Sequence, residues 1–129
     1  MKKKYLIVIT DYYQDISKGL LNSALKLIPR STLIKIIKVP GVFEIPVTIS
    51  KNIKRFDAVL ALGCVIKGKT PHFDFISNAT TDAIMKLSID NKKPIGNGII
   101  TCLNMRQAKA RKVKGEEAAR AVISLLSQK

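Results

Sequence analysis

The only histidine of the chain, His72, stands between a segment that predicts a strand and a segment that predicts a helix. The apolar run from Ala58 to Ile66 is typical of a buried strand, and Gly68 and Pro71 then interrupt it. In parallel α/β sheets, ligands bind at the carboxyl ends of the strands, and imidazole exchanges protons readily near neutral pH. His72 is therefore a candidate general acid or base. The simpler alternative is a histidine that bonds to the backbone at a helix start.

The residues just before His72 have the composition of an anion-binding loop. Gly68 lets the backbone approach a ligand closely, because glycine has no side chain. Lys67 and Lys69 add two ammonium groups, and Thr70 adds a hydroxyl, at the N-terminus of the predicted helix. This segment predicts proton transfer beside a bound phosphate.

Two further segments carry candidate ligand-binding side chains. Glu44 is the only acid between Asp15 and Asp57. Its carboxylate either stabilises the start of the next helix or accepts hydrogen bonds from ligand hydroxyls. The preceding Phe43 either belongs to the core or lines a pocket. Tyr12, which follows the first predicted strand together with a second tyrosine, either covers a sheet edge or stacks on a planar ring.

Arg111 and Lys114 are the last candidates. Basic residues on a helix surface are usually only solvated. The sharper alternative is a guanidinium that forks onto a phosphate.

Alternating strands and helices would position these side chains. Strands are predicted at Tyr5–Thr10, Leu33–Val39, Ala58–Ile66 and Ile95–Thr101. Helices are predicted after a capping Ser17, from Pro46, from His72 to about Asp90, from Met105 to about Arg111, and from Glu116 to Ser127. The long helix would turn Ile76, Ala79, Ala83 and Leu87 inward. This order predicts one α/β domain, residues 1–129, with a parallel sheet covered by helices on both faces. Lys35 and Lys38 indicate that the second strand lies near an edge.

Composition narrows the class of function. No apolar run is long enough to span a bilayer, and the start of the chain reads as a strand, so we expect a cytoplasmic protein without a membrane partner. The net charge of +14 would suit a protein that binds nucleic acid. However, the 23 Lys and Arg residues are scattered and lack interleaved aromatics, so we expect small anionic ligands and no nucleic acid. Cys64 and Cys102 have no metal-like spacing, which predicts reduced, packed thiols.

Three segments, in order, resemble the lumazine synthase family of riboflavin biosynthesis. The stretch from Val39 to Pro46, VPGVFEIP, resembles the family's VPGAFEIP segment. The stretch from Ala61 to Asp74, ALGCVIKGKTPHFD, resembles its ALGxVIRGxTxHxD segment. Gly98 to Thr101, then Gln107-Ala108 with Arg111, and then the KGEEAA stretch from Lys114, resemble its C-terminal GxLT…QAxxRA…NKGxEAA pattern.

The resemblance implies a flavodoxin-like three-layer sandwich with a four-stranded parallel sheet. It implies condensation of 5-amino-6-(D-ribitylamino)uracil with 3,4-dihydroxy-2-butanone 4-phosphate to give 6,7-dimethyl-8-ribityllumazine, phosphate and water. The implied assembly is a homopentamer or a multiple of pentamers with active sites at subunit interfaces. Riboflavin synthase is the downstream candidate partner. Neither a metal nor an organic cofactor is implied.

The resemblance also implies a role for each matching residue. His72 is the general acid/base, and Arg111 acts on the phosphate. The implied substrate-binding positions are Tyr12, Val42, Phe43, Glu44, Val65, Ile66, Gly68, Lys69, Thr70, Asn97 and Lys114. Tyr12 would stack on the pyrimidine, residues 42–44 would bind the ribityl chain and the ring, and residues 65 and 66 would contribute pocket backbone. Residues 68–70 would hold the phosphate, and Lys114 matches the basic residue of the NKG motif.

The sequence departs from the family at four places. Tyr12 replaces the commoner Phe or Trp, and Asn97 stands where many members place an aromatic that reaches the neighbouring subunit's site. Leu103 stands where an acid is frequent, and the segment from Arg111 to Lys114 is short. Three alternatives remain: a shell or binding protein that keeps the fold without activity, a nucleic-acid binder, and an archaeal-type riboflavin synthase. The stretch TPHFD that ends at Asp74 favours lumazine synthase over the last.

Overall fold

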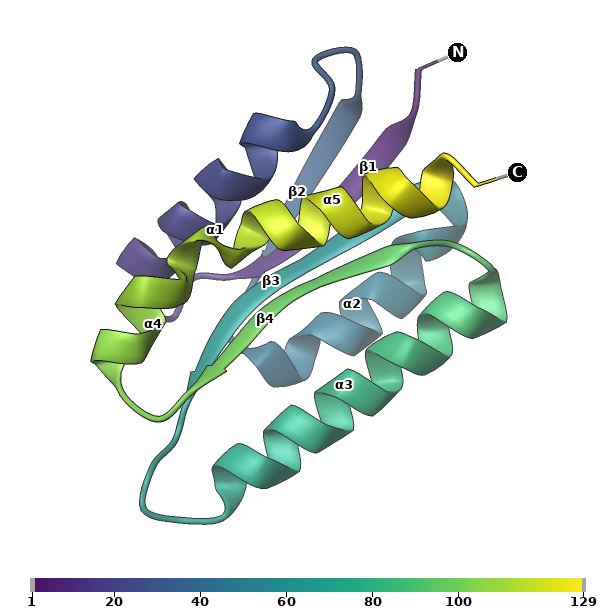
Figure 1. The fold of residues 1–129 in the computed structure, drawn as a ribbon. Helices are drawn as coiled ribbons and strands as arrows, with labels where there is room; N and C mark the ends of the chain where they lie inside the picture. The colour runs from purple at the N-terminus through teal and green to yellow at the C-terminus, as the bar shows by residue number, and fades with distance from the viewer. Residues whose placement is uncertain (1, 129) are drawn as a thin grey trace.

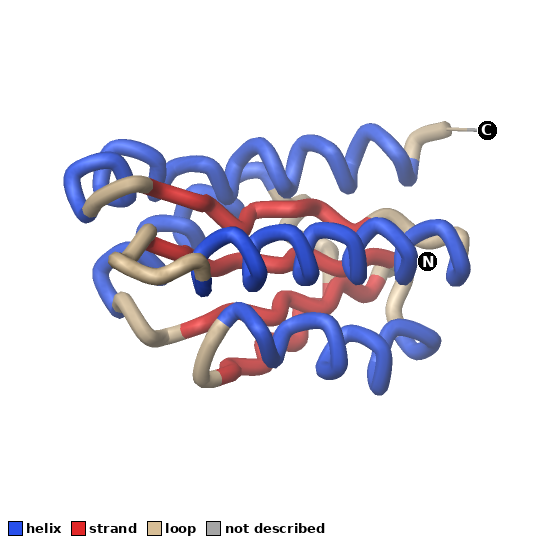
Figure 2. The backbone as a smooth tube through the Cα atoms, turned by 90° about the horizontal axis from the view of Figure 1, so that it is seen from below, coloured by secondary structure: helices blue, strands red, loops and turns tan. Residues whose placement is uncertain are grey.

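In the computed structural model, which describes residues 2–128, four parallel strands form one sheet between two layers of helices. The strands are β1 (Lys4–Thr10), β2 (Leu33–Val39), β3 (Ala58–Ile66) and β4 (Ile95–Cys102), in the order β2-β1-β3-β4. One face is covered by α1 (Gln14–Leu27), α4 (Met105–Arg111) and α5 (Gly115–Leu126), and the other by α2 (Ile45–Asn52) and α3 (His72–Asn91) (Figure 1). Figure 2 shows helices on both sides of the sheet. The predicted flavodoxin-like three-layer class is confirmed.

The two central strands are buried on both faces. Leu6 and Ile7 of β1 and Leu60 and Ala61 of β3 are all fully buried. Their side chains alternate between two apolar cores, one under α1 and α5 and the other under α2 and α3. Burial on both faces explains why these strands read as continuous apolar runs.

The strand predictions are confirmed to within one residue. The prediction that β2 lies near an edge is also confirmed, because β2 pairs only with β1 and most of it is exposed. No helix among the described residues has both the length and the apolar character needed to cross a membrane.

Two details of the helix predictions are wrong. Ser17 does not cap α1, because the helix begins at Gln14; the buried Ser17 hydroxyl instead donates to the carbonyl of Thr10, at the end of β1. Ala79 does not face inward, because Thr80 takes the buried position of that turn of α3. Both errors have the same cause. Ser17 and Thr80 are polar but buried, and the sequence pattern alone assigns such residues to a helix cap or to the surface.

Two glycines in β4 let α5 lie directly on the sheet. A Cβ at Gly96 would collide with the backbone carbonyl of Ala118, and a Cβ at Gly98 would collide with the side chain of Leu62. Short 3₁₀ turns at Val42–Glu44, Ile53–Arg55 and Lys112–Lys114 complete the connections to α2, β3 and α5.

Gly96→Ala should destabilise the protein by about 1–3 kcal/mol, because the new methyl group meets helix backbone, which cannot move aside as a flexible side chain would. Urea unfolding followed by circular dichroism measures the change. Gly68→Ala is the matched control, since a Cβ there meets nothing within 4 Å. Equal unfolding midpoints for the two variants would contradict the close contact between α5 and β4.

Candidate active site

The principal hollow lies at the carboxyl ends of β1 and β3. At this point the strand order switches, because β2 lies on one side of β1 whereas β3 and β4 lie on the other. Such a switch point is the usual ligand site of open α/β sheets. The hollow has a volume of about 710 Å³. It is lined by Thr10, Tyr12, Tyr13, Gly41, Val42, Phe43, Glu44, Cys64, Val65, Ile66, His72 and Ile76. Three connections that are distant in sequence, those that follow β1, β2 and β3, therefore contribute to one site.

The structure brings together many of the side chains that the sequence singled out. Tyr12, residues 42–44, Val65, Ile66 and His72 all line this hollow. Sequence reasoning missed Thr10, Gly41, Cys64 and Ile76 as lining residues. The available signal was position, because Thr10 and Cys64 lie at or near strand ends and Ile76 follows His72 by one helical turn.

Two glycines shape the turn that carries Glu44. A Cβ at Gly41 would lie 3.2 Å from Glu44 Oε1, so the carboxylate lies close over this turn. A Cβ at Gly63 would lie 3.0 Å from Val42 Cγ2 and 3.1 Å from Thr10 Oγ1. The missing side chains let the turn pack tightly against β1 and β3. Val42 is buried there, while the next residue, Phe43, is 63% exposed beside the hollow.

The two tyrosines after β1 have different surroundings. Their rings pack edge to face, with centroids 4.8 Å apart and planes at 82°. Tyr13 packs against the core, and its burial, more than the neighbouring Tyr12, raises the pKa of its hydroxyl. Tyr12 is 74% exposed. Tyr12 therefore offers a ring face for stacking while Tyr13 supports it from the side.

His72 is the first residue of α3 and is exposed at the wall of the hollow. Its backbone amide donates to the Thr70 hydroxyl at 3.4 Å. Among the residues that the structure describes, no hydrogen bond occupies its imidazole, so the ring is free for a ligand. Gly68, Lys69 and Thr70 form an exposed loop next to it in the chain but do not line the hollow.

Arg111 and Lys114 lie elsewhere in the single chain. They line a second hollow of about 500 Å³, together with Thr101, Val113 and several residues of α5. Arg111 Nη1 donates to the Thr101 carbonyl oxygen at 3.2 Å. Asn97 lies exposed on β4, where its Oδ1 accepts from the Ile99 amide at 3.0 Å, and it lines neither hollow. One chain alone therefore does not bring His72 and Arg111 into the same hollow.

The two cysteines are buried and unpaired. Burial, assisted by the neighbouring Cys102, raises the pKa of the Cys64 thiol to about 12. Cys64 is therefore a protonated wall of the hollow and not a nucleophile. Within residues 2–128, no group of three or more His, Cys, Asp or Glu side chains is placed to hold a metal ion.

A family model and several known proteins that this chain resembles all carry the same description. The family model described as 6,7-dimethyl-8-ribityllumazine synthase matches residues 2–129. The 6,7-dimethyl-8-ribityllumazine synthase of Corynebacterium kroppenstedtii is 38% identical over 125 residues, covering 91% of this chain and 79% of the relative. The protein of that name from Cutibacterium acnes is 38% identical over 96% of this chain and 80% of its own length. That from Nitrobacter hamburgensis is 40% identical over 94% of this chain and 82% of its own length.

The burial of Cys64 predicts slow alkylation. At pH 8, iodoacetamide should modify Cys64 in the native protein at least roughly 10²-fold more slowly than in urea, because its thiolate is scarce and shielded. The rate should rise only as the pH approaches the raised pKa. Mass spectrometry of digested samples measures modification at Cys64 and Cys102 separately. Equal rates in native and unfolded protein would show that the hollow exposes the sulfur.

Proposed function

The chain belongs to the 6,7-dimethyl-8-ribityllumazine synthase family, and from this we propose that it is an enzyme that condenses 5-amino-6-(D-ribitylamino)uracil with 3,4-dihydroxy-2-butanone 4-phosphate. The products are 6,7-dimethyl-8-ribityllumazine, phosphate and water, in the penultimate step of riboflavin biosynthesis. The observation that carries the proposal is the hollow at the switch point, where Tyr12, Glu44 and His72 meet.

The walls of this hollow suit a planar ring with a polyhydroxyl side chain. The exposed ring of Tyr12 stacks on the pyrimidine, and the Glu44 carboxylate accepts hydrogen bonds from ribityl hydroxyls. Phe43 and Val42 contact the chain and the ring, and the backbone of Val65 and Ile66 bonds to the edge of the pyrimidine. These contacts hold one reactant in place for the other.

The reaction joins an amine to a ketone, expels phosphate and closes a ring. It requires positioning and proton transfers, and none of the chain's residues needs to be a strong nucleophile. Holding both reactants together accounts for up to about 7–11 kcal/mol of barrier reduction in favourable cases. His72, free at the wall of the hollow, carries protons and adds roughly 10²–10⁴-fold. We propose that no metal or organic cofactor takes part.

A bound phosphate needs cations, and no lysine or arginine among residues 2–128 of the same chain lines this hollow. We propose that Gly68, Lys69 and Thr70 hold the phosphate together with Arg111 of a neighbouring copy. This arrangement accounts for the placement of Arg111 in a different hollow from His72. Asn97 and Lys114 would reach the neighbour's site in the same way.

Exposed apolar residues on two different faces support a ring of identical subunits. Phe43, Val47 and Phe75 are 63%, 58% and 68% exposed on the α2 and α3 side. Leu103 and Val113, near α4, are 59% and 62% exposed. A cyclic assembly pairs one face with the other face of the next copy. We propose the pentamer, or a multiple of it.

The product has a defined fate in this proposal. Riboflavin synthase would consume the lumazine, and both enzymes would act in the cytoplasm. The unpaired Cys64 and Cys102 suit such a reducing compartment.

His72→Ala should lower kcat/KM by roughly 10²-fold without abolishing turnover, because positioning survives the loss of proton transfer. Arg111→Ala should lower it by roughly 10³-fold, since binding and departure of phosphate both depend on the guanidinium. Mixing the two substrates with protein and following the lumazine chromophore measures both variants. Arg106→Ala, on the same helix and outside both hollows, is the matched control. If Arg111→Ala behaved like the control, the phosphate assignment would be wrong.

A mixed assembly tests whether the site is shared between copies. His72→Ala and Arg111→Ala chains, each nearly inactive alone, should regain activity when co-expressed in equal amounts. Roughly one site in four then combines an intact His72 with an intact Arg111 from the next copy. The recovered activity should scale with that fraction. Mixtures no more active than the better single variant would place both residues within one chain's site.

A further inference from the structure

The end of the sheet opposite the candidate active site gathers positive charge. Four segments lead into the strands there: residues 2–4, 28–33, 53–58 and 91–95, which together we call the amino edge. In Figure 1 this end lies at the upper right, where the N-terminus and the start of β2 are found. Its cations are Lys2, Lys3, Lys4, Arg30, Lys54, Arg55, Lys92 and Lys93. Eight of the 23 lysines and arginines, which are scattered along the sequence, therefore lie on one surface.

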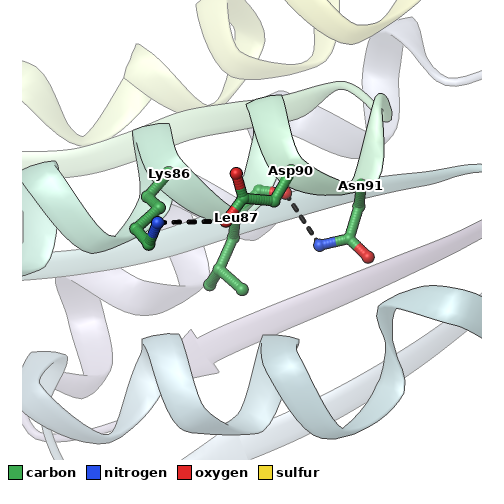
Figure 3. Close-up of polar contacts among 4 residues, drawn as sticks. All are labelled: Lys86, Leu87, Asp90 and Asn91. Carbon is green, nitrogen blue, oxygen red and sulfur yellow. Dashed lines mark hydrogen bonds and ion pairs between the residues drawn. The ribbon is translucent and has the colours of Figure 1, made fainter.

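Acidic side chains do not offset this charge. Asp57 is the only acid in the four segments, and its carboxylate accepts a hydrogen bond from the Lys4 amide at 2.7 Å. The next acid is Asp90, in the last turn of α3, whose Oδ2 lies 3.3 Å from Lys86 Nζ (Figure 3). The amino edge thus presents eight cations beside one carboxylate.

Contacts between the segments hold them in fixed relative positions. Lys93 Nζ donates to the carbonyl oxygens of Ile53 and Lys54, at 3.1 Å each, and so ties the α3–β4 connection to the α2–β3 connection. The Leu33 amide donates to the Lys3 carbonyl oxygen at 2.9 Å. Only Lys93 among the eight cations is half-buried; the others are exposed.

A hollow of about 350 Å³ opens beside the edge strand β2 on this surface. It is lined by Lys4, Leu33, Ile34, Lys35, Arg55 and Phe56. Three cations and an aromatic ring border it, and no acid does. Cations that track a phosphate backbone, with an aromatic ring on which a base stacks, are the combination that single-stranded nucleic acids require.

We propose that the amino edge binds single-stranded nucleic acid, with the phosphate chain lying across the exposed lysines and arginines and a base entering the hollow at Phe56. A bilayer fits less well, because the exposed large apolar residues in and beside these segments are Leu33 and Ile34 of β2, at 48% and 38%, and Ile89 near the end of α3, at 65%, and they form no apolar face of a single amphipathic helix. The proposal reverses the expectation from sequence and does not depend on the proposed enzymatic activity, whose hollow lies at the other end of the strands.

Fluorescence anisotropy with a labelled RNA strand of about twenty nucleotides tests the proposal at a range of salt concentrations. The triple variant Lys54→Gln, Arg55→Gln, Lys92→Gln should weaken binding at least roughly tenfold at about 0.15 M salt. It should also reduce the slope of log K against log salt by roughly 2, since each neutralised phosphate contributes roughly 0.7. The control Lys18→Gln, Arg106→Gln, Lys109→Gln removes the same charge from exposed positions away from this edge and should change binding less than roughly twofold.

Three further measurements distinguish the source of any binding. The charge-retaining variant Lys54→Arg, Arg55→Lys, Lys92→Arg should keep wild-type affinity, and circular dichroism verifies that every variant folds. Single-stranded DNA should compete with RNA, and duplex DNA should compete more weakly. Equal weakening by the two Gln triples would overturn the proposal, because binding would then depend on the total charge of the protein and not on the position of the cations. Wild-type binding only to phosphatidylserine vesicles, or to no polyanion at physiological salt, would overturn it as well.

Discussion

The parallel pairing of β1 with β3 is the constraint on which the rest of the structure depends. Five residue pairs, from Tyr5 with Ala58 to Ile9 with Leu62, join the two strands in one direction. This pairing buries both strands on both faces and brings the ends of β1 and β3 side by side. Because β2 then lies on one side and β4 on the other, the connections after β1 and β3 diverge and leave a hollow between them. All segments that lead into the strands lie at the opposite end of the sheet. The parallel arrangement of the strands therefore creates two surfaces, the hollow at their carboxyl ends and the amino edge.

Much of this arrangement could be predicted from sequence, for identifiable reasons. Strand positions follow from burial: residues 58–66 read as a continuous apolar run because both of their faces are covered. The local pattern mispredicts Ser17 and Ala79, since it does not show that Ser17 bonds to the end of β1 or that Thr80 occupies a buried position. Most of the hollow was predictable from strand ends and from the family resemblance. The placement of Arg111 was not, because nothing in the local sequence shows that packing within the chain puts Arg111 and His72 in different hollows.

The cations of the amino edge could not be grouped from the sequence either. Along the chain, Arg30, Lys54 and Lys92 are separated by dozens of residues, and nothing in their local sequence connects them. The alternation of strands and helices returns the chain to the same edge each time, so each return adds its cations to one surface. A repeated alternation of strands and helices can therefore gather on one surface charges that lie far apart in the sequence. The connections at the carboxyl ends of the strands contain Glu44 as well as Lys67 and Lys69, so acidic and basic residues are more nearly balanced there.

The glycines of β4 have a consequence for how this protein can diverge. With no side chain at Gly96 or Gly98, the separation between α5 and the sheet is set by direct contact with the helix at Ala118, whose carbonyl oxygen would collide with a Cβ at Gly96. A contact with backbone has no alternative rotamers, so it cannot absorb a larger residue at Gly96 by a local side-chain rearrangement. The other face of the same strand, where Asn97 and Thr101 are exposed, carries no such restriction. Substitutions can therefore accumulate on one side of β4 and adjust what packs there, while the inner side stays fixed and preserves the position of α5.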